Sequence, residues 1–159
     1  MLETLTDIPL FLDLTPTQLS RLDPLFETYS CPARTIIFEQ GEHPQYLYVL
    51  IQGTVAIRYK PYDGQTITIT HLQKGDAFGW SAVIGSRVYT SGSISNTRVE
   101  AIRIRGDDLR TLLRTDPDTG RIILNRLADF VSSRWKNAHA EVQALFDKGL
   151  EGSKRNGDE

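Results

Sequence analysis

The stretch IIFEQGEHPQYLYVLIQGTVAI, from Ile36 to Ile57, contains three short apolar runs. The runs IIF, YLYVLI and TVAI are rich in β-branched and aromatic residues, which favour strands over helices. Gly41 and Gly53 fall between these runs, where glycine punctuates the ends of strands. Short strands in close succession, joined by glycine-containing turns, are typical of a sandwich, jelly roll or barrel.

The same pattern extends to both sides of this stretch, from Ala33 to Arg105. TITITHL, at residues 66–72, alternates with a period of two residues, and VEAIRI reads as a final strand. Asp63-Gly64 is a hairpin-turn signal between two such runs. We therefore expect a β-roll over residues 31–105.

The flanking regions have helical signals instead. Thr15, Pro16 and Gln18 form a predicted capping box with proline in the first turn, and Pro24 is expected to end that helix. After Gly106, Asp107 is expected to cap a short helix. Asp116-Pro117 is expected to begin a long one. An apolar stripe with steps of three and four residues follows: Ile123, Leu127, Val131, Trp135, Ala138, Val142 and Leu145.

These signals predict a single domain over residues 1–149. It would comprise a helical lead (1–30), the β-roll (31–105) and C-terminal helices (106–149). The fold class is α+β and mainly β. The Gly-rich, charged residues 150–159 are expected to form a disordered tail.

Composition limits the classes of function. The 159 residues are 40% apolar and 24% charged, with a formal net charge of −2. This charge argues against a general affinity for nucleic acid or anionic membranes. The single cysteine excludes an intrachain disulfide. We find no signal peptide and no apolar run near the roughly 20 residues that cross a bilayer. We therefore expect a cytoplasmic protein without membrane contact.

The residues that usually carry catalysis or bind metals are dispersed. His43, His71 and His139 form no metal-ligand spacing, and no serine or cysteine lies in a recognisable nucleophile motif. We therefore expect neither a metal site nor a cofactor, and no enzymatic activity.

The order of helix, β-roll and two C-terminal helices resembles the cyclic nucleotide-binding domain of the catabolite activator protein family. The resemblance extends from Leu5 to about Phe146. It includes the lead DIPLFLDLTPTQLSRLDPLFE, the strands quoted above, GDAFGWSA at the position of the family's phosphate-binding cassette, and DPDTGRIILNRLADFVSSRW at its dimerising helix.

The cassette departs from the family pattern at two positions. The resemblance implies F-G-E, whose glutamate holds the ribose hydroxyl, followed by an arginine that pairs with the cyclic phosphate. Here Trp80 replaces the glutamate, and Tyr89 falls at the arginine position. Arg87 takes that position only if the next hairpin gains two residues. The candidate ligand-binding residues are Phe78, Gly79, Trp80, Ser81, Ala82, Arg87, Tyr89, Thr90 and Ser91.

The individual residues leave alternatives open. Trp80 either stacks on a flat ligand or fills its space, and Arg87 is either a solvated loop arginine or a phosphate ligand. Ser81, Thr90 and Ser91 either donate to a ligand or populate a turn. Tyr89 either donates a hydrogen bond to an anion or is simply packed.

Three functions follow from these alternatives. The first is a stand-alone regulatory sensor with an altered pocket, which binds a non-standard small ligand or none. The second is a true cAMP or cGMP receptor that uses Arg87, and the third is a protein-interaction module without a ligand. The resemblance also implies a homodimer through Ile123, Leu127, Val131, Trp135, Ala138 and Val142. Because the sequence stops at Glu159, before the family's helix-turn-helix domain, we expect no direct DNA binding.

Overall fold

The computed structural model describes residue 5 and residues 7–130, and it opens with helical segments. These are the 3₁₀ turn η1 (Pro9–Phe11), the helix α2 (Pro16–Leu22) and the 3₁₀ turn η2 (Asp23–Leu25). The predicted capping box is confirmed: the Thr15 hydroxyl accepts from the Gln18 N–H at 3.2 Å, and the Gln18 side chain accepts from the Thr15 N–H at 2.9 Å. Pro24 lies in η2, so α2 ends where the sequence predicts.

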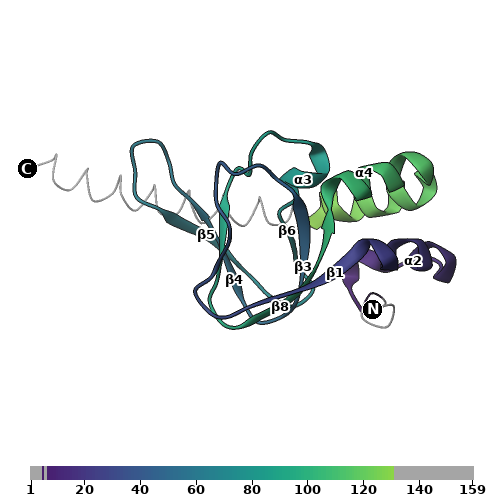
Figure 1. Cartoon of the computed structure of the whole chain (residues 1–159), viewed down its shortest axis with the longest axis horizontal. Coiled ribbons are helices and arrows are strands. Elements are labelled where there is room, and N and C mark those ends of the chain that lie inside the picture. Colours follow the sequence, from purple (N-terminus) through teal and green to yellow (C-terminus); the bar gives the residue numbers. More distant parts are fainter. Residues whose placement is uncertain (1–4, 6, 131–159) are drawn as a thin grey trace, which may run out of the picture.

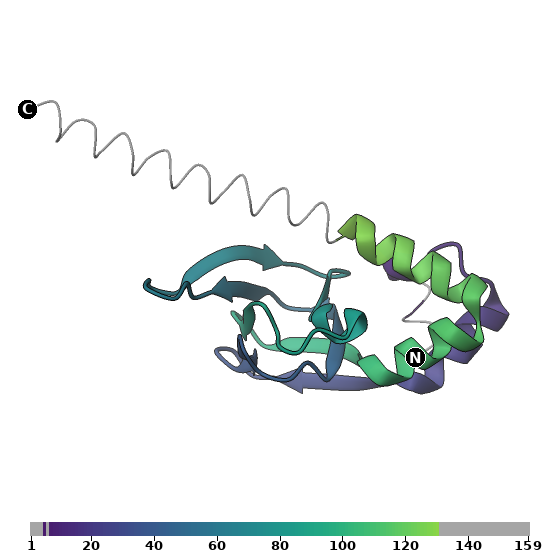
Figure 2. The same ribbon diagram turned by 90° about the horizontal axis from the view of Figure 1, so that it is seen from above.

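Two four-stranded antiparallel sheets follow, with strand orders β1-β8-β3-β6 and β2-β7-β4-β5. Their strands are β1 (Phe26–Cys31), β2 (Ile36–Phe38), β3 (Tyr46–Gln52), β4 (Val55–Tyr59), β5 (Ile67–Leu72), β6 (Ala77–Phe78), β7 (Gly92–Ser95) and β8 (Val99–Arg105). The two sheets face each other, and the helices gather at one end of the sandwich (Figures 1 and 2). The predicted α+β, mainly β, roll is confirmed.

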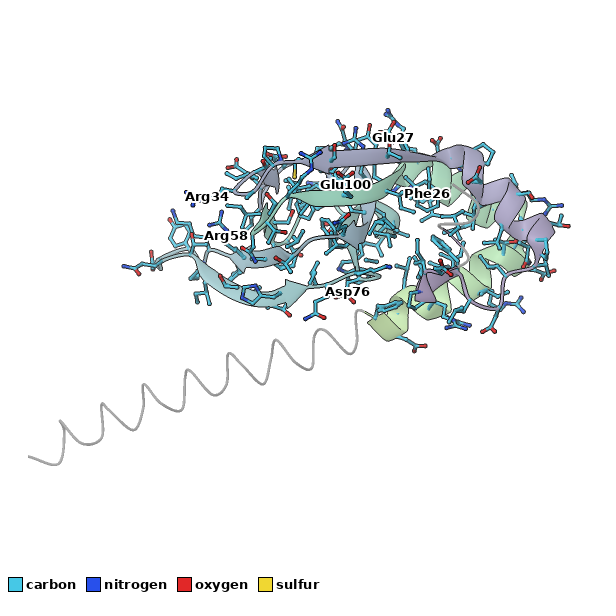
Figure 3. All side chains as sticks on the ribbon, turned by 90° about the horizontal axis from the view of Figure 1, so that it is seen from below. Phe26, Glu27, Arg34, Arg58, Asp76 and Glu100 are labelled. Atoms are coloured by element: carbon cyan, nitrogen blue, oxygen red, sulfur yellow. The ribbon has the colours of Figure 1, made fainter. Side chains whose placement is uncertain are left out.

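Strand alternation divides the interior into two apolar clusters. In β1, for example, Phe26 and Glu27 lie on opposite sides of the ribbon (Figure 3). The first cluster, which we call the helix-side core, joins the helices to one face of the β1 sheet and includes Leu10, Phe11, Leu22, Leu47, Val49, Ile104 and Leu109. The second, the roll core, lies between the sheets and includes Phe38, Tyr48, Leu50, Val55, Ile57, Leu72, Phe78, Tyr89 and Val99.

Two helical segments complete the described chain. α4 (Gly106–Thr115) is followed by a helix described over residues 117–130. Asp116 caps the second helix as predicted, since its carboxylate accepts from the Thr119 hydroxyl at 2.7 Å and from the Thr119 N–H at 3.4 Å. Arg21 of α2 pairs with the same carboxylate and so ties the N-terminal helix to this cap.

Three expectations need correction. The sheet begins at Phe26 rather than at residue 31, because β1 pairs with β8 along its whole length. Asp107 does not cap α4; it lies in the first turn after Arg105, which occupies the N-cap position. Ile123 and Leu127, predicted to form a dimer contact, are buried in the helix-side core of their own chain. The remaining predicted contact residues, Val131, Trp135, Ala138 and Val142, lie outside the described residues.

Candidate ligand site

The candidate cassette connects β6 to β7 through the short helix α3 (Ser81–Ile84). Gly79 lies just before Trp80, the N-cap of this helix, and has a φ of +80°. A Cβ on Gly79 would lie 2.8 Å from the Tyr46 carbonyl oxygen. Gly85 ends the helix in the left-handed conformation, with φ of +73°. Only glycine fits the close approach at Gly79, so this residue fixes where the cassette leaves β6.

Several amide donors of the cassette are already engaged within its own turns. The N–H groups of Ala82 and Val83 donate to the carbonyls of Gly79 and Trp80 at 3.2 and 2.8 Å. The Ser86 N–H donates to the Ser81 carbonyl at 3.1 Å. These three donors are therefore used to hold the backbone of the cassette.

Tyr89 points inward and is fully bonded. The residue is only 4% exposed. Its hydroxyl donates to the Tyr46 carbonyl at 2.7 Å and accepts from the Tyr46 N–H at 3.2 Å. Its backbone pairs with Glu42 and Gly41 at 2.9 Å each. Burial raises the pKa of Tyr89 to about 12, despite the hydrogen bonds that favour the phenolate. The neutral phenol therefore serves as a structural link between the cassette and β3.

Tyr89 also completes an aromatic stack inside the roll. Its ring lies 3.9 Å from the ring of Phe38 between centroids, with an interplanar angle of 19°. Phe38 continues to Tyr48 at 5.9 Å and to Phe78 at 6.1 Å. These four rings pack between the two sheets, so side chains occupy that part of the roll interior.

Trp80 packs in a different direction from Tyr89. It lies at the N-cap of α3 without a capping hydrogen bond, half-buried against the helix-side core. Tyr89 belongs to the roll core. The structure therefore does not bring these two candidate residues into one side-chain cluster.

The remaining candidate residues divide between interior and surface. Ser81 and Ala82 are buried in α3, and Phe78 is buried in the roll core. Thr90 is exposed and Ser91 half-buried. Arg87 is exposed and makes no hydrogen bond or ion pair within residues 7–130, which leaves its guanidinium available to a ligand or to water.

Three partners of the cassette were not predicted from the sequence. Tyr46 supplies the backbone groups that hold Tyr89. Gly106 lies so close to α3 that a Cβ there would overlap the Ala82 carbonyl oxygen. Arg110 donates to that same carbonyl and to Asp107. No short-range sequence signal identifies the contacts of Tyr46, Gly106 and Arg110 with the cassette, because each joins residues far apart in the chain.

Other kinds of site are not seen in the described residues. Within them, no three His, Cys, Asp or Glu side chains lie close enough together to hold a metal ion. Among the helices described, none is both long and apolar enough to span a membrane. An open hollow of about 490 Å³ lies beside η1 and is lined by Asp7, Ile8, Pro9, Leu50, Ile51, Lys74 and Gly75. This lining includes Gly75, the first residue of GDAFGWSA, but none of the candidate ligand-binding residues.

Comparison with known proteins gives consistent matches. Residues 29–116 match the family model of the cyclic nucleotide-binding domain. The cAMP-activated global transcriptional regulator CRP of Pasteurella multocida is 30% identical over 115 residues, covering 72% of this chain and 53% of that protein. The chain thus spans about half the length of the curated relatives it matches.

Solved structures agree with this match. A cyclic nucleotide-binding protein from Geobacter metallireducens is similar with a TM-score of 0.74 and 27% identity, over 84% of this chain and 96% of that one. The regulatory subunit of a cAMP-independent protein kinase A from Trypanosoma brucei has a TM-score of 0.74 at 18% identity, over 90% of this chain and 49% of that one. The latter likeness shows a shared fold.

Proposed function

The chain belongs to the cyclic nucleotide-binding domain family, and we propose that it is a non-catalytic regulatory sensor whose altered pocket binds cAMP and cGMP weakly. Its similarity to regulatory proteins supports the regulatory class. The observation that carries the altered pocket is Tyr89, which lies where the family resemblance implies a phosphate-binding arginine. Its phenol is buried and its hydroxyl bonds to the backbone of Tyr46.

The physical argument concerns the charge of a cyclic phosphate. A neutral, buried phenol lacks the charge-assisted, bidentate contact that a guanidinium makes with a phosphate. Such a lost contact costs a few kcal/mol, or about a hundredfold in affinity. Trp80 adds to this loss, because an indole offers one donor and no acceptor to a ribose hydroxyl. Ligands that need neither a guanidinium contact to a phosphate nor a carboxylate contact to a ribose hydroxyl fit the pocket better.

A screen tests this proposal directly. Cyclic mononucleotides and cyclic dinucleotides are added to the full chain, and the midpoint of thermal unfolding is measured, because a ligand of the native state raises it. We expect no shift with cAMP or cGMP at micromolar concentrations. A shift with another ligand would identify the input of the sensor. A protein-interaction module would show no shift with any of them.

The second candidate is a true cyclic nucleotide receptor that uses Arg87, which is exposed and unpaired among the described residues. Micromolar binding of cAMP to the wild type, lost in Arg87→Ala, would establish this candidate and overturn the first. Arg114→Ala is the matched control, since Arg114 is also exposed and unpaired within the described chain but lies on α4.

A gain-of-function variant tests whether Trp80 and Tyr89 are the cause of weak cAMP binding. Trp80→Glu with Tyr89→Arg restores both anchors implied by the resemblance, and we expect the variant to bind cAMP more tightly than the wild type. Because Tyr89 is buried, the unfolding midpoint must be measured first to establish that the variant is folded. A folded variant without increased affinity would contradict the proposed role of these two positions.

Two further properties are part of the proposal. We propose a homodimer that forms through the apolar stripe beyond Phe130. We also propose that this chain does not bind duplex DNA directly, for which its net charge of −2 is the support. Relatives such as the Pasteurella regulator are named as transcriptional regulators, so retardation of duplex DNA in a gel is the test.

A further inference from the structure

The second half of the cassette is a loop of residues 85–91, which joins α3 to β7 and which we call the cassette loop. From Ile84 to Val88 no side chain is buried, and these two aliphatic residues are 57% and 42% exposed. All residues of the loop are described, and Tyr89 is the only buried one among them. Apolar burial therefore holds the cassette loop to the body of the protein at Tyr89.

The two ends of the cassette loop are held by separate contacts. α3 packs directly on α4 (Figure 1), where Gly106 lies against the Ala82 carbonyl and Arg110 donates to it. At the other end, β7 pairs with β4 from Gly92 onward and also with β2. These contacts lie outside the loop, so the cassette loop can leave its place while both of its ends stay attached.

Tyr89 attaches the loop at the edge of β3. β6 pairs with β3 at Tyr48 and Val49 and then ends at Phe78, so no described strand reaches the backbone of Tyr46 on that side. The Tyr89 hydroxyl takes the place of a strand there. It donates to the Tyr46 carbonyl at 2.7 Å and accepts from the Tyr46 N–H at 3.2 Å. One side chain thus satisfies two backbone groups that need partners.

The backbone and the ring of Tyr89 add further attachments. Its N–H donates to the Glu42 carbonyl and its carbonyl accepts from the Gly41 N–H, each at 2.9 Å. Its ring stacks on that of Phe38, with 3.9 Å between the centroids. Tyr89 therefore joins the cassette loop to β3, to β2 and to the turn after β2, all within the protein's own chain.

We propose that Tyr89 is a built-in latch of the cassette loop, and that the switching step of the sensor is the release of Tyr89 from Tyr46. The bonds come from the protein's own side chain, so the loop is held whether or not a ligand binds. A ligand or partner that displaces Tyr89 frees the cassette loop while α3 and β7 stay attached. This inference rests on the proposed function as a regulatory sensor, but the latch can be tested without a ligand.

Limited proteolysis of the full chain tests the latch. Trypsin cleaves after arginine and lysine, and Arg87 is exposed in the cassette loop. Because a protease needs an extended segment of chain, cleavage after Arg87 requires the loop to leave its place. Arg34, which is exposed in the turn between β1 and β2, is the internal reference. Mass spectrometry measures both cleavage rates, and their ratio reports the opening of the cassette loop.

Tyr89→Phe removes the hydroxyl and retains the ring. This variant should raise the ratio of cleavage after Arg87 to cleavage after Arg34 by about tenfold or more, because both backbone groups of Tyr46 lose their partner. Tyr62→Phe is the matched control. It makes the same change at a tyrosine that is 99% exposed and should leave the ratio unchanged.

A second control separates the latch from a general loss of stability. Ile104→Val removes one carbon from the helix-side core, where Ile104 is fully buried, and should lower the midpoint of thermal unfolding. Cleavage after Arg87 and after Arg34 should then rise together, so their ratio should stay at the wild-type value. A latch predicts that Tyr89→Phe raises the ratio and that Ile104→Val does not.

Two outcomes would overturn the proposal. One is an unchanged ratio in Tyr89→Phe, which would show that other contacts hold the cassette loop. The other is an equal rise of the ratio in Tyr89→Phe and Ile104→Val, which would show that Tyr89 only supports the core. Neither measurement uses a ligand, so a failure of the latch is distinguishable from a failure of the nucleotide screen.

Discussion

Two serines of β7 lie on the same inner face of the roll but differ in their bonding. The Ser95 hydroxyl donates to the Pro32 carbonyl at 2.7 Å and accepts from the Thr35 N–H at 2.8 Å. The Ser93 hydroxyl is equally buried and has no partner among the described residues. We expect Ser95→Ala to lower the free energy of unfolding by about 1–3 kcal/mol, and Ser93→Ala to leave it unchanged or raise it. Chemical denaturation of both variants measures this, and equal losses would contradict the assignment.

Tyr89 should show its structural role in alkaline solution. An unfolded tyrosine ionises with a pKa of about 10, whereas burial raises the pKa of Tyr89 to about 12. Because the pKa is higher in the folded state, its stabilising contribution is complete below about pH 10. It is lost as the pH rises towards 12.

Comparison with Tyr89→Phe isolates this contribution from those of other tyrosines. The variant should unfold about 1–3 kcal/mol more easily at pH 7, since the Tyr46 backbone groups lose their partner. Between about pH 10 and pH 12 the wild type should lose more stability than the variant. Parallel losses in both proteins would show that Tyr89 ionises normally.

At the scale of elements, α3 and α4 meet without a side chain between them. Gly106 begins α4 directly against the Ala82 carbonyl, and Arg110 donates to that carbonyl from one turn further along. We expect Gly106→Ala to force the two helices apart and to lower the free energy of unfolding by about 1–3 kcal/mol. Arg114→Ala, at an exposed position of α4, is the control and should have little effect. A stable Gly106→Ala protein would show that α3 moves freely relative to α4.

At the scale of the whole molecule, the apolar stripe beyond Phe130 is the predicted site of dimerisation. Val131→Glu with Ala138→Glu places two carboxylates in that stripe, and sedimentation should then show the loss of one association step. Ser133→Glu is the control, because a residue two positions from Val131 lies away from the stripe in a helix. Ile123 and Leu127 are unsuitable targets, since both belong to the core of their own chain. A double variant that still forms the wild-type dimer would place the interface elsewhere.

The sequence by itself determined the features whose signals are local. The Thr15 capping box and the Asp116 cap depend on a few neighbouring residues, and each forms as predicted. A turn does connect β4 to β5 near Asp63-Gly64, but its hydrogen bond joins the Gly64 N–H to the Pro61 carbonyl, and neither Asp63 nor Gly64 has a positive φ. Strand-forming residues and the order of elements were enough to predict the β-roll and to identify the family. The start of β1 at Phe26 was missed, because FETYSC becomes a strand by pairing with β8, which lies far along the chain.

Only the tertiary structure decided where the candidate side chains point. Trp80 and Tyr89 lie close together in the sequence, yet one packs on the helix-side core and the other in the roll core. Ile123 and Leu127 follow the same apolar period as residues beyond Phe130, and the period does not distinguish a core contact from a dimer contact. The physical reason is that burial depends on which distant surfaces meet. A hydrophobic pattern specifies that a face will be covered, and the assembled fold determines what covers it.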